Sequence, residues 1–343
     1  MAASPQVSIL YVPADCGSIA PGKFKAPKAF QEVGIASKLG KAGVPSVMEM
    51  VALDSPVTCE ASTHCPERIR NEQMNIAVCI SVECFVSVDL QRSGTPQHLV
   101  EEWSLHPSSL LPWFQLIIGG ECCILPAILS AYWKHAGVQS PEKRVGLIYI
   151  DADTELTSPT DPSSTGTFAG MTMAHLLRLP GALPQMQQFT RPSGEPVCDY
   201  TNTVLFGTNM HLPGNKPEHF QYLSDNYYKV ISSDAVAKSP EHCATEALEY
   251  LDDVDVIMVH LDVDSIDPGT FPLADVPNFT GVEFEEMMRA LKILLRNNKV
   301  GGLVVTEVNP DHDPGLVMVD RLAGRIADML GERSMIMMGN QQL

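Results

Sequence analysis

Short apolar runs recur along the chain and predict the strands of a sheet. They span residues 7–12 (VSILYV), 114–118 (FQLII), 145–150 (VGLIYI), 204–206 (VLF), 254–261 (VDVIMVHL) and 303–308 (LVVTEV). Each run is followed closely by Gly, Asp or Pro, and the runs are close to continuous rather than alternating with polar residues. Runs of this kind are typical of parallel strands that are covered on both faces.

Helical patterns fill the intervals between these runs. They cover residues 122–135, 171–179, 245–251, 282–295 and the stretch from Pro314 onward. Strands that alternate with helices favour an α/β fold with three layers, α/β/α, and a mostly parallel, doubly wound sheet. No internal repeat or linker-like stretch interrupts the pattern, so residues 1–343 are expected to form a single domain.

Composition and charge narrow the classes of function. The 343 residues include 23 Lys and Arg against 41 Asp and Glu, a formal net charge of −18. This balance argues against a nucleic-acid partner and against docking on an anionic membrane surface. The chain lacks a run of about 18 consecutive apolar residues, so no membrane span is expected.

Cysteine usage and the N-terminal residues indicate a compartment. The sequence begins MAASPQVSILYVPADCG, without the charged and apolar regions of a secretory signal. The nine cysteines are odd in number and irregularly spaced, which favours free thiols over a disulfide framework. A cytoplasmic location is therefore expected.

Carboxylates follow two of the predicted strands at a spacing of two. Asp151, Asp153 and Glu155 come directly after residues 145–150, and Asp262 and Asp264 come after the run that ends at residue 261. Residues two apart in extended backbone share one face, and open α/β sheets carry their sites at the carboxyl ends of the strands. We therefore expect these side chains to converge.

A convergent set of five carboxylates repels itself unless protons or cations neutralise it. Hard cations with oxygen ligands would remove the repulsion, which predicts a metal site. The alternative is that these acids only cap loops and helix starts, a common role for Asp after a strand.

Several segments resemble the arginase/agmatinase (ureohydrolase) family. The segment HLDVDSIDPGTFPLADVPNFTGVEF is similar to the family signature DVDxxDPxxxPxxGTPxxGG. The segments IDADTE, LIIGGECC, VVTEVNP and APGKFKAPKAFQEVGIASKL resemble the family's DAHTD, GGDHS, EVNP and GVExGPxxLR. Order and spacing agree from about residue 7 to about residue 330, which is nearly the whole chain.

The resemblance implies an arginase-type fold, a small-molecule substrate and a homo-oligomer, either a trimer or a hexamer. In that family two Mn²⁺ ions share a hydroxide that attacks a guanidinium carbon and releases urea. Asp151, Asp262 and Asp264 match family ligands, with Asp264 also expected to be catalytic. Glu307 matches the acid that holds the substrate guanidinium.

Three ligand positions depart from the family pattern. Cys122 and Asp153 stand where the family has His, and Glu155 stands where it has Asp. All three can still bind a cation, so the resemblance and the residue types predict a remodelled metal site. Its ligands would be Cys122, Asp151, Asp153, Glu155, Asp262 and Asp264.

The remodelled ligands also change the expected metal. A thiolate and five carboxylates are more anionic than the family's set, which favours Fe or Zn beside Mn, as one or two divalent ions. Cys122 has an alternative role as a buried thiol at a helix start, where its pKa would be lowered. Glu121, in the family's Asp position, is expected to support the ligands from outside.

The positions that bind the substrate and transfer protons in that family also carry different residues here. The family's catalytic His falls on Ala169, which cannot transfer a proton, and both acids of GxRDxD are missing from residues 207–212. These losses argue against arginine as the substrate. Glu307 and the Ser/Thr-rich loop that begins at Thr157 and runs to residue 167 are expected to bind whatever substrate replaces it.

Three functions are compatible with these residues. The leading one, and the reason to lean towards an enzyme, is a metal-dependent hydrolase acting on a C–N bond of a guanidino- or amide-like small molecule. The second is a non-catalytic, regulatory or structural relative. The third is a redox or elimination reaction that uses iron and the thiolate.

Other polar residues have simpler interpretations. His260 is expected to be a core histidine, with a supporting role at the metal site as the alternative. His211 is expected to be a loop residue or a substitute proton carrier, and His312 a surface residue. Cys59, His64 and Cys65 lack a fourth ligand at zinc-site spacing.

Overall fold

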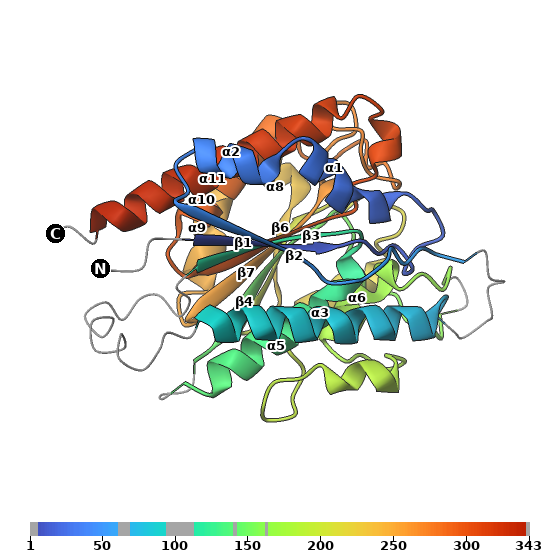
Figure 1. Cartoon of the computed structure of the whole chain (residues 1–343). Coiled ribbons are helices and arrows are strands. Elements are labelled where there is room, and N and C mark those ends of the chain that lie inside the picture. The colour runs from blue at the N-terminus through green and yellow to red at the C-terminus, as the bar shows by residue number, and fades with distance from the viewer. Residues whose placement is uncertain (1–5, 61–68, 94–112, 140–142, 162–163, 341–343) are drawn as a thin grey trace.

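One parallel sheet organises the molecule (Figure 1). The computed structural model describes residues 6–60, 69–93, 113–139, 143–161 and 164–340. Eight strands pair in the order β2-β1-β3-β8-β7-β4-β5-β6, every pair parallel. The strands are β1 (Gln6–Val12), β2 (Ser46–Val51), β3 (Trp113–Gly119), β4 (Val145–Ile150), β5 (Thr203–Thr208), β6 (Lys229–Ser232), β7 (Val256–Asp262) and β8 (Val300–Thr306).

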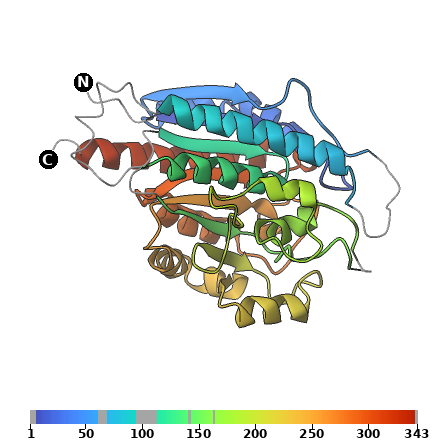
Figure 2. The ribbon, with the colours of Figure 1, turned by 90° about the horizontal axis from the view of Figure 1, so that it is seen from below.

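Helices cover both faces of the sheet, as Figures 1 and 2 show. One face carries α1 (Ala26–Glu32), α2 (Ile35–Lys41), α8 (Ser233–Lys238), α9 (Pro240–Tyr250), α10 (Phe284–Arg296) and α11 (Val317–Asn340). The other carries α3 (Glu72–Ser93), α5 (Leu125–Gly137), α6 (Thr172–Leu176) and α7 (Pro217–Asp225). The predicted three-layer α/β/α fold is confirmed.

The central strands match the predicted apolar runs because burial on both faces selects apolar side chains. All residues of β4, β7 and β8 are buried, and their side chains alternate between two hydrophobic cores. β8 ends at Thr306, two residues before the predicted run does, because Glu307 takes a left-handed backbone with φ 62°. The chain thus turns out of the sheet at a residue predicted to belong to the site.

Two strands lacked a sequence signal because both lie at an edge of the sheet. β2 and β6 end the strand order, and their residues are half-buried or exposed apart from Ile231. An edge strand has neighbours on one side only, so its sequence is not restricted to apolar residues.

Helix α3 was not predicted, and its apolar residues surround the helix axis. By length and composition alone Glu72–Arg92 is apolar enough to cross a membrane, although polar and charged residues interrupt its apolar runs. In the structure α3 lies beside α5, and Val78, Val82 and Val86 pack into the core under the sheet. Gln115 of β3 also donates a hydrogen bond to Asp89 of this helix.

The predicted helix over residues 122–135 begins later than expected. Cys122–Ile124 form a 3₁₀ turn, and the α-helix α5 starts at Leu125, with Pro126 in its first turn. Proline suits that position because its missing N–H has no helical partner there. Cys122 is therefore held in a turn between β3 and α5, at the carboxyl edge of the sheet.

Candidate metal and substrate site

Two groups of ligand side chains meet where the central strands end. Cys122, Asp262 and Glu307 form one group, and Asp151, Asp153 and Asp264 form the other. Within each group, one ligand atom per residue lies within 4.8 Å of the others. All six side chains are buried except Asp153, which is half-buried. Four of the five acids that were expected to converge, Asp151, Asp153, Asp262 and Asp264, therefore belong to these two groups.

Short hydrogen bonds orient the carboxylates at the ends of these two strands. Asp262 Oδ1 accepts the backbone N–H of Asp264 at 2.9 Å, and Asp151 Oδ1 accepts that of Asp153 at 2.7 Å. Asp264 Oδ1 accepts the N–H of Ala152 at 3.3 Å, which links the end of β7 to that of β4. Asp151, Asp262 and Asp264 thus each have one carboxylate oxygen fixed by a backbone N–H group.

The remaining oxygen of Asp151 tests whether these residues fit a cation. Asp151 Oδ2 is buried and has no hydrogen-bond partner among the residues that the structure describes. A buried carboxylate oxygen is costly without a donor or an ion. With two other carboxylates beside it, the chemistry of this position fits a divalent ion with oxygen ligands.

Burial and mutual repulsion hold the protons on these acids when no cation is bound. Burial, followed by the charge of neighbouring carboxylates, raises the pKa of Asp151, Asp262 and Asp264 well above the usual range. Burial also raises the pKa of Asp153 to about 6. A bound cation would reverse this effect, because it favours the ionised form.

Glu155, a predicted ligand, lies beside the groups and belongs to neither of them. Its backbone is left-handed, with φ 47°, so the alternation of Asp151 and Asp153 does not continue to Glu155. Its carboxylate accepts hydrogen bonds from the Cys122 thiol at 3.1 Å and from the Tyr149 hydroxyl. Residues in left-handed backbone cluster at functional sites because their surroundings must hold them there.

Cys122 is enclosed by acids and a hydroxyl. Its sulfur lies 3.1 Å from Glu155 Oε1 and 3.9 Å from Glu307 Oε1, and it accepts a hydrogen bond from Thr172 Oγ1 at 3.3 Å. Burial, reinforced by these carboxylates, raises the pKa of the Cys122 thiol. The predicted lowering by a helix start is wrong, since burial outweighs one short turn.

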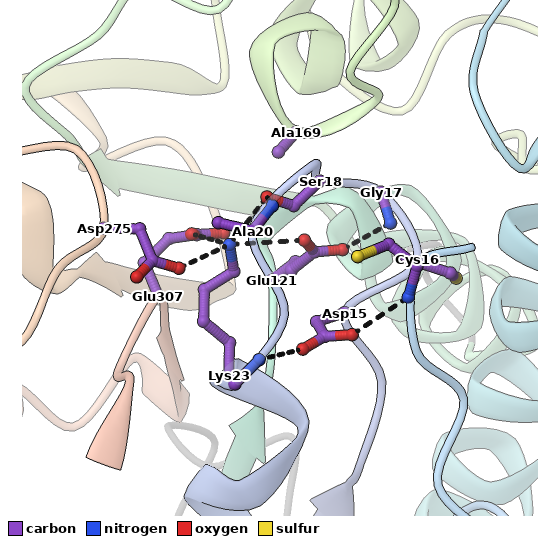
Figure 3. A network of polar contacts seen from close by, with 12 residues as sticks. Asp15, Cys16, Gly17, Ser18, Ala20, Lys23, Glu121, Ala169, Asp275 and Glu307 are labelled. Atoms are coloured by element: carbon purple, nitrogen blue, oxygen red, sulfur yellow. Dashed lines mark hydrogen bonds and ion pairs between the residues drawn. The ribbon is translucent and has the colours of Figure 1, made fainter. Parts of the chain in front are cut away.

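Glu307 was predicted to hold a substrate cation, and the structure gives it a cation from the chain itself. Lys23 Nζ lies 3.2 Å from Glu307 Oε2, 3.2 Å from Asp275 Oδ2 and 3.5 Å from Glu121 Oε1 (Figure 3). Lys23 also donates to Ser18 Oγ at 2.9 Å and is 1% exposed.

Lys23 keeps its positive charge although its side chain is buried. Burial lowers the pKa of Lys23, but Glu307, Glu121 and Asp275 raise it by more, so the pKa lies above the usual value. Burial raises the pKa of Glu121 to about 8, against the effect of Lys23.

The turn that presents Lys23 is held by Asp15. Its carboxylate accepts the backbone N–H groups of Gly22 at 2.7 Å, Phe24 at 3.2 Å and Cys59 at 3.2 Å. Gly22 has φ 136°, and a Cβ there would come within 2.4 Å of the Asn309 side chain. Sequence reasoning missed Lys23, because a lysine two residues from Lys25 has no local feature that marks it as buried.

Ala169, at the family's proton-carrier position, lies above the Lys23 network (Figure 3). Its carbonyl oxygen is 3.5 Å from Cys122 Sγ and accepts a hydrogen bond from Thr172 Oγ1. The residue therefore belongs to the wall of the site but has no group that can carry a proton. Glu121, the expected supporting acid, accepts the N–H of Gly17 at 2.6 Å and contacts Lys23.

His260 is a core histidine, as expected. It stacks on Tyr149 with 4.6 Å between ring centroids, and its Nε2 lies 2.9 Å from Thr306 Oγ1. Burial lowers the pKa of His260 to about 3, so the ring is neutral. Through Tyr149 it supports the residue that donates to Glu155.

The other singled-out histidines lie at the surface or at the border of the site. His211 is exposed, with Nε2 3.9 Å from Asp234, and His312 Nε2 lies 3.3 Å from Asp275. Thr157 is half-buried in the loop that follows Glu155. His64 and Cys65 lie outside the described residues.

Comparisons with known proteins agree with the geometry. The family model "Arginase family" matches residues 5–331. Arginase of Staphylococcus aureus (strain COL) is 24% identical over 226 residues, which are 64% of this chain and 68% of that protein.

Two solved structures share the fold. Entamoeba histolytica arginase, in complex with L-ornithine, aligns with TM-score 0.78 and 17% identity over 96% of this chain and 99% of that chain. Formimidoylglutamase of Bacillus subtilis aligns with TM-score 0.65 and 16% identity over 96% and 87%.

Proposed function

Because this chain belongs to the arginase family, we propose that it is a metal-dependent hydrolase acting on a C–N bond of a guanidino- or amide-like small molecule other than arginine. The observation that carries the proposal is the pair of buried ligand groups at the ends of the central strands. Burial of so many acids in one place is costly unless cations neutralise them.

The ligand groups suggest where divalent ions would be held. Cys122, Asp262 and Glu307 would hold one, and Asp151, Asp153 and Asp264 the other, with Glu155 ready to join once the Cys122 proton is displaced. Bound divalent ions supply Lewis acidity for the activation of water. Manganese is expected from the family, and the sulfur ligand makes iron or zinc an alternative.

The chain's own residues set the rest of the chemistry. Hydrolysis forms a C–O bond with the oxygen of water, breaks the C–N bond and delivers a proton to the leaving nitrogen. Asp264 is proposed as the group that receives the proton of water. One of its carboxylate oxygens accepts a hydrogen bond from the backbone N–H of Ala152. Ala169 cannot carry this proton onward, so the leaving nitrogen would take it from Asp264 or from solvent.

Two departures from the family support a substrate other than arginine. Asn209 donates to Asn278 at 2.5 Å and to Thr280, so this position holds the loop around residues 278–280. Met210 and Leu212 lack a carboxylate for an amino group. The loop from Thr157 is proposed to contact the far end of the substrate.

The test combines metal content with product analysis. Purified protein, reconstituted in turn with Mn, Fe, Zn and Ni, would be analysed for bound metal and then incubated with a panel of guanidines, amidines and carboxamides. We expect one or two ions per chain, and release of urea or ammonia from one class. Protein that binds none of the four metals would overturn the proposal.

The family also suggests how the chain assembles and where it is located. A trimer or hexamer in the cytoplasm is proposed from the family. Sedimentation of the metal-loaded protein would test the oligomer, and imaging of a tagged chain would test the location.

A non-catalytic relative is the second candidate, and one contact and one residue type favour it. Lys23 already pairs with Glu307, and Ala169 has no proton to give. Metal bound without turnover of any member of the panel would favour this candidate over the hydrolase.

A further inference from the structure

We propose that Lys23 is a resident cation at Glu307, and that it selects a substrate whose reacting carbon carries no charge, a carboxamide or a ureide, over a guanidinium or an amidinium. The substrate class rests on the proposed hydrolase. The assignment of Lys23 rests on its contacts alone.

Both oxygens of Glu307 already have neighbours from the chain itself, and the Lys23 contact is the one that a substrate cation would have to displace. Oε2 lies 3.2 Å from Lys23 Nζ, and Oε1 faces Cys122 Sγ at 3.9 Å within the first ligand group. A guanidinium binds a carboxylate best through two parallel N–H···O bonds, which need both oxygens at once. Glu307 cannot offer that pair of acceptors while Lys23 is in place.

Both the ammonium group and the backbone of Lys23 are held in place by contacts. Its ammonium has three N–H donors, and four oxygen partners lie within 3.5 Å, from Ser18, Glu121, Asp275 and Glu307. Its backbone lies in the turn that Asp15 binds, between Gly22 and Phe24. A buried ammonium would lose these partners on moving away, so the contact is a permanent part of the site.

Glu307 is equally restricted. Its left-handed backbone, φ 62°, is held by an N–H···O bond to Gly120 at 2.9 Å. A Cβ on Gly120 would come within 1.7 Å of the Ala14 carbonyl oxygen, so this segment is packed against the strand end before Asp15. The backbone that carries the Glu307 carboxylate is therefore held in place beside Lys23.

The positive charge of Lys23 then disfavours a cationic substrate relative to a neutral one. A guanidinium placed at Glu307 would lie next to the Lys23 ammonium, in a site with little water to screen the repulsion. A carboxamide or ureide carries no charge and can use the same surroundings through its N–H and C=O groups. Its hydrolysis is balanced by water alone: the C–O bond forms, the C–N bond breaks, and the leaving nitrogen takes a proton.

The test measures binding, so that it does not depend on turnover. Calorimetric titration with methylguanidinium chloride, against N-methylurea and sodium chloride, would be run on the full-length wild type and on four variants: Lys23→Met, Glu307→Gln, Lys23→Met/Glu307→Gln and Lys25→Met. Lys25 is the matched control, since it pairs with Asp311 on the surface. We expect Lys23→Met to gain saturable methylguanidinium binding, about tenfold or more tighter than in wild type, and the double variant to lose it.

Two outcomes decide the assignment. Wild-type protein that binds methylguanidinium saturably, with loss of binding in Glu307→Gln, would overturn it, and this comparison holds even if Lys23→Met does not fold. Equal binding by wild type and Lys23→Met would overturn it as well.

The hydrolase proposal can be refuted independently of the Lys23 assignment. A protein that shows the expected binding pattern but hydrolyses nothing keeps the resident cation and loses the enzyme. A protein that hydrolyses guanidines and binds methylguanidinium through Glu307 keeps the enzyme and loses the resident cation.

Discussion

The sulfur of Cys122 lies 3.1 Å from the Oε1 atom of Glu155, so a residue that follows β3 touches one that follows β4. In this contact the thiol donates its proton to the carboxylate. A cation bound by Cys122 would displace that proton and leave Glu155 Oε1 facing the same ion. The contact thus defines a position where a thiol can become a ligand.

Substitution of Cys122 tests whether sulfur binds the metal. Protein loaded with Co²⁺ is expected to show a sulfur-to-cobalt charge-transfer band, because Cys122 belongs to the first ligand group. The band should vanish in Cys122→Ser and persist in Cys123→Ser, whose buried sulfur contacts Asn75 and Glu121 instead. Absorption spectra of the three proteins are the measurement, and an unchanged band in Cys122→Ser would refute the ligand assignment.

Substitution of Asp151 tests the second ligand group. Asp151→Asn is expected to weaken divalent-ion binding by more than about 100-fold, since loss of an outer partner alone costs about 10-fold to 100-fold. Near neutral pH the metal-free variant should be more stable than metal-free wild type, because folded wild type must hold a proton on buried Asp151 and Asn needs none. Chelator competition and urea unfolding measure the two effects.

The matched control for Asp151 is an exposed acid. Asp252 pairs with Lys299 at the surface, and Asp252→Asn should leave both metal affinity and stability within error. Metal affinity that falls equally in both variants would mean that general charge, and not a site, attracts the ion.

Tyr149 holds Glu155, and its hydroxyl can be removed without loss of the ring. Tyr149→Phe keeps the stack on His260 but leaves a buried carboxylate oxygen without its donor. The expected cost is about 1–3 kcal/mol of unfolding free energy in the metal-free protein, measured by urea denaturation. The double variant Tyr149→Phe/Glu155→Leu should recover part of this cost. A Tyr149→Phe variant as stable as wild type would disprove the role of the hydroxyl.

Stability of the metal-free protein should fall as the pH rises from about 6.5 to about 8. The unfolded acids are already ionised there, whereas folded Glu121 has its pKa raised by burial to about 8 and still holds a proton. The folded state therefore binds more protons, which gives the negative slope. Buried His175 and His260 have lowered pKa values and are neutral in both states near the upper end of this range, so they do not reverse the sign.

Chemical denaturation across this pH range checks the slope. Glu121→Gln should reduce it, and divalent ions should flatten it because they hold the site acids in the ionised form. A stability that rises with pH in the metal-free protein would contradict the assignment of the protons to these acids.

The layers of the fold and four acids of the site can be predicted from the pattern of residues along the chain. Residues 145–150 and 254–261 are apolar because both sheet faces are covered, and Asp151, Asp153, Asp262 and Asp264 follow them where parallel strands end together. Burial and alternation are local properties, so they are visible in a string of residues. Edge strands β2 and β6 lack that property and were missed.

The partner of each acid depends on how distant segments of the chain pack together in three dimensions. Glu155 leaves the alternating pattern because its backbone turns left-handed, and Glu307 faces Lys23 because a turn held by Asp15 reaches across from the N-terminal region. Such encounters depend on the packing of loops from distant parts of the chain. The residue types predict which charges need a partner, and the fold alone selects the partner.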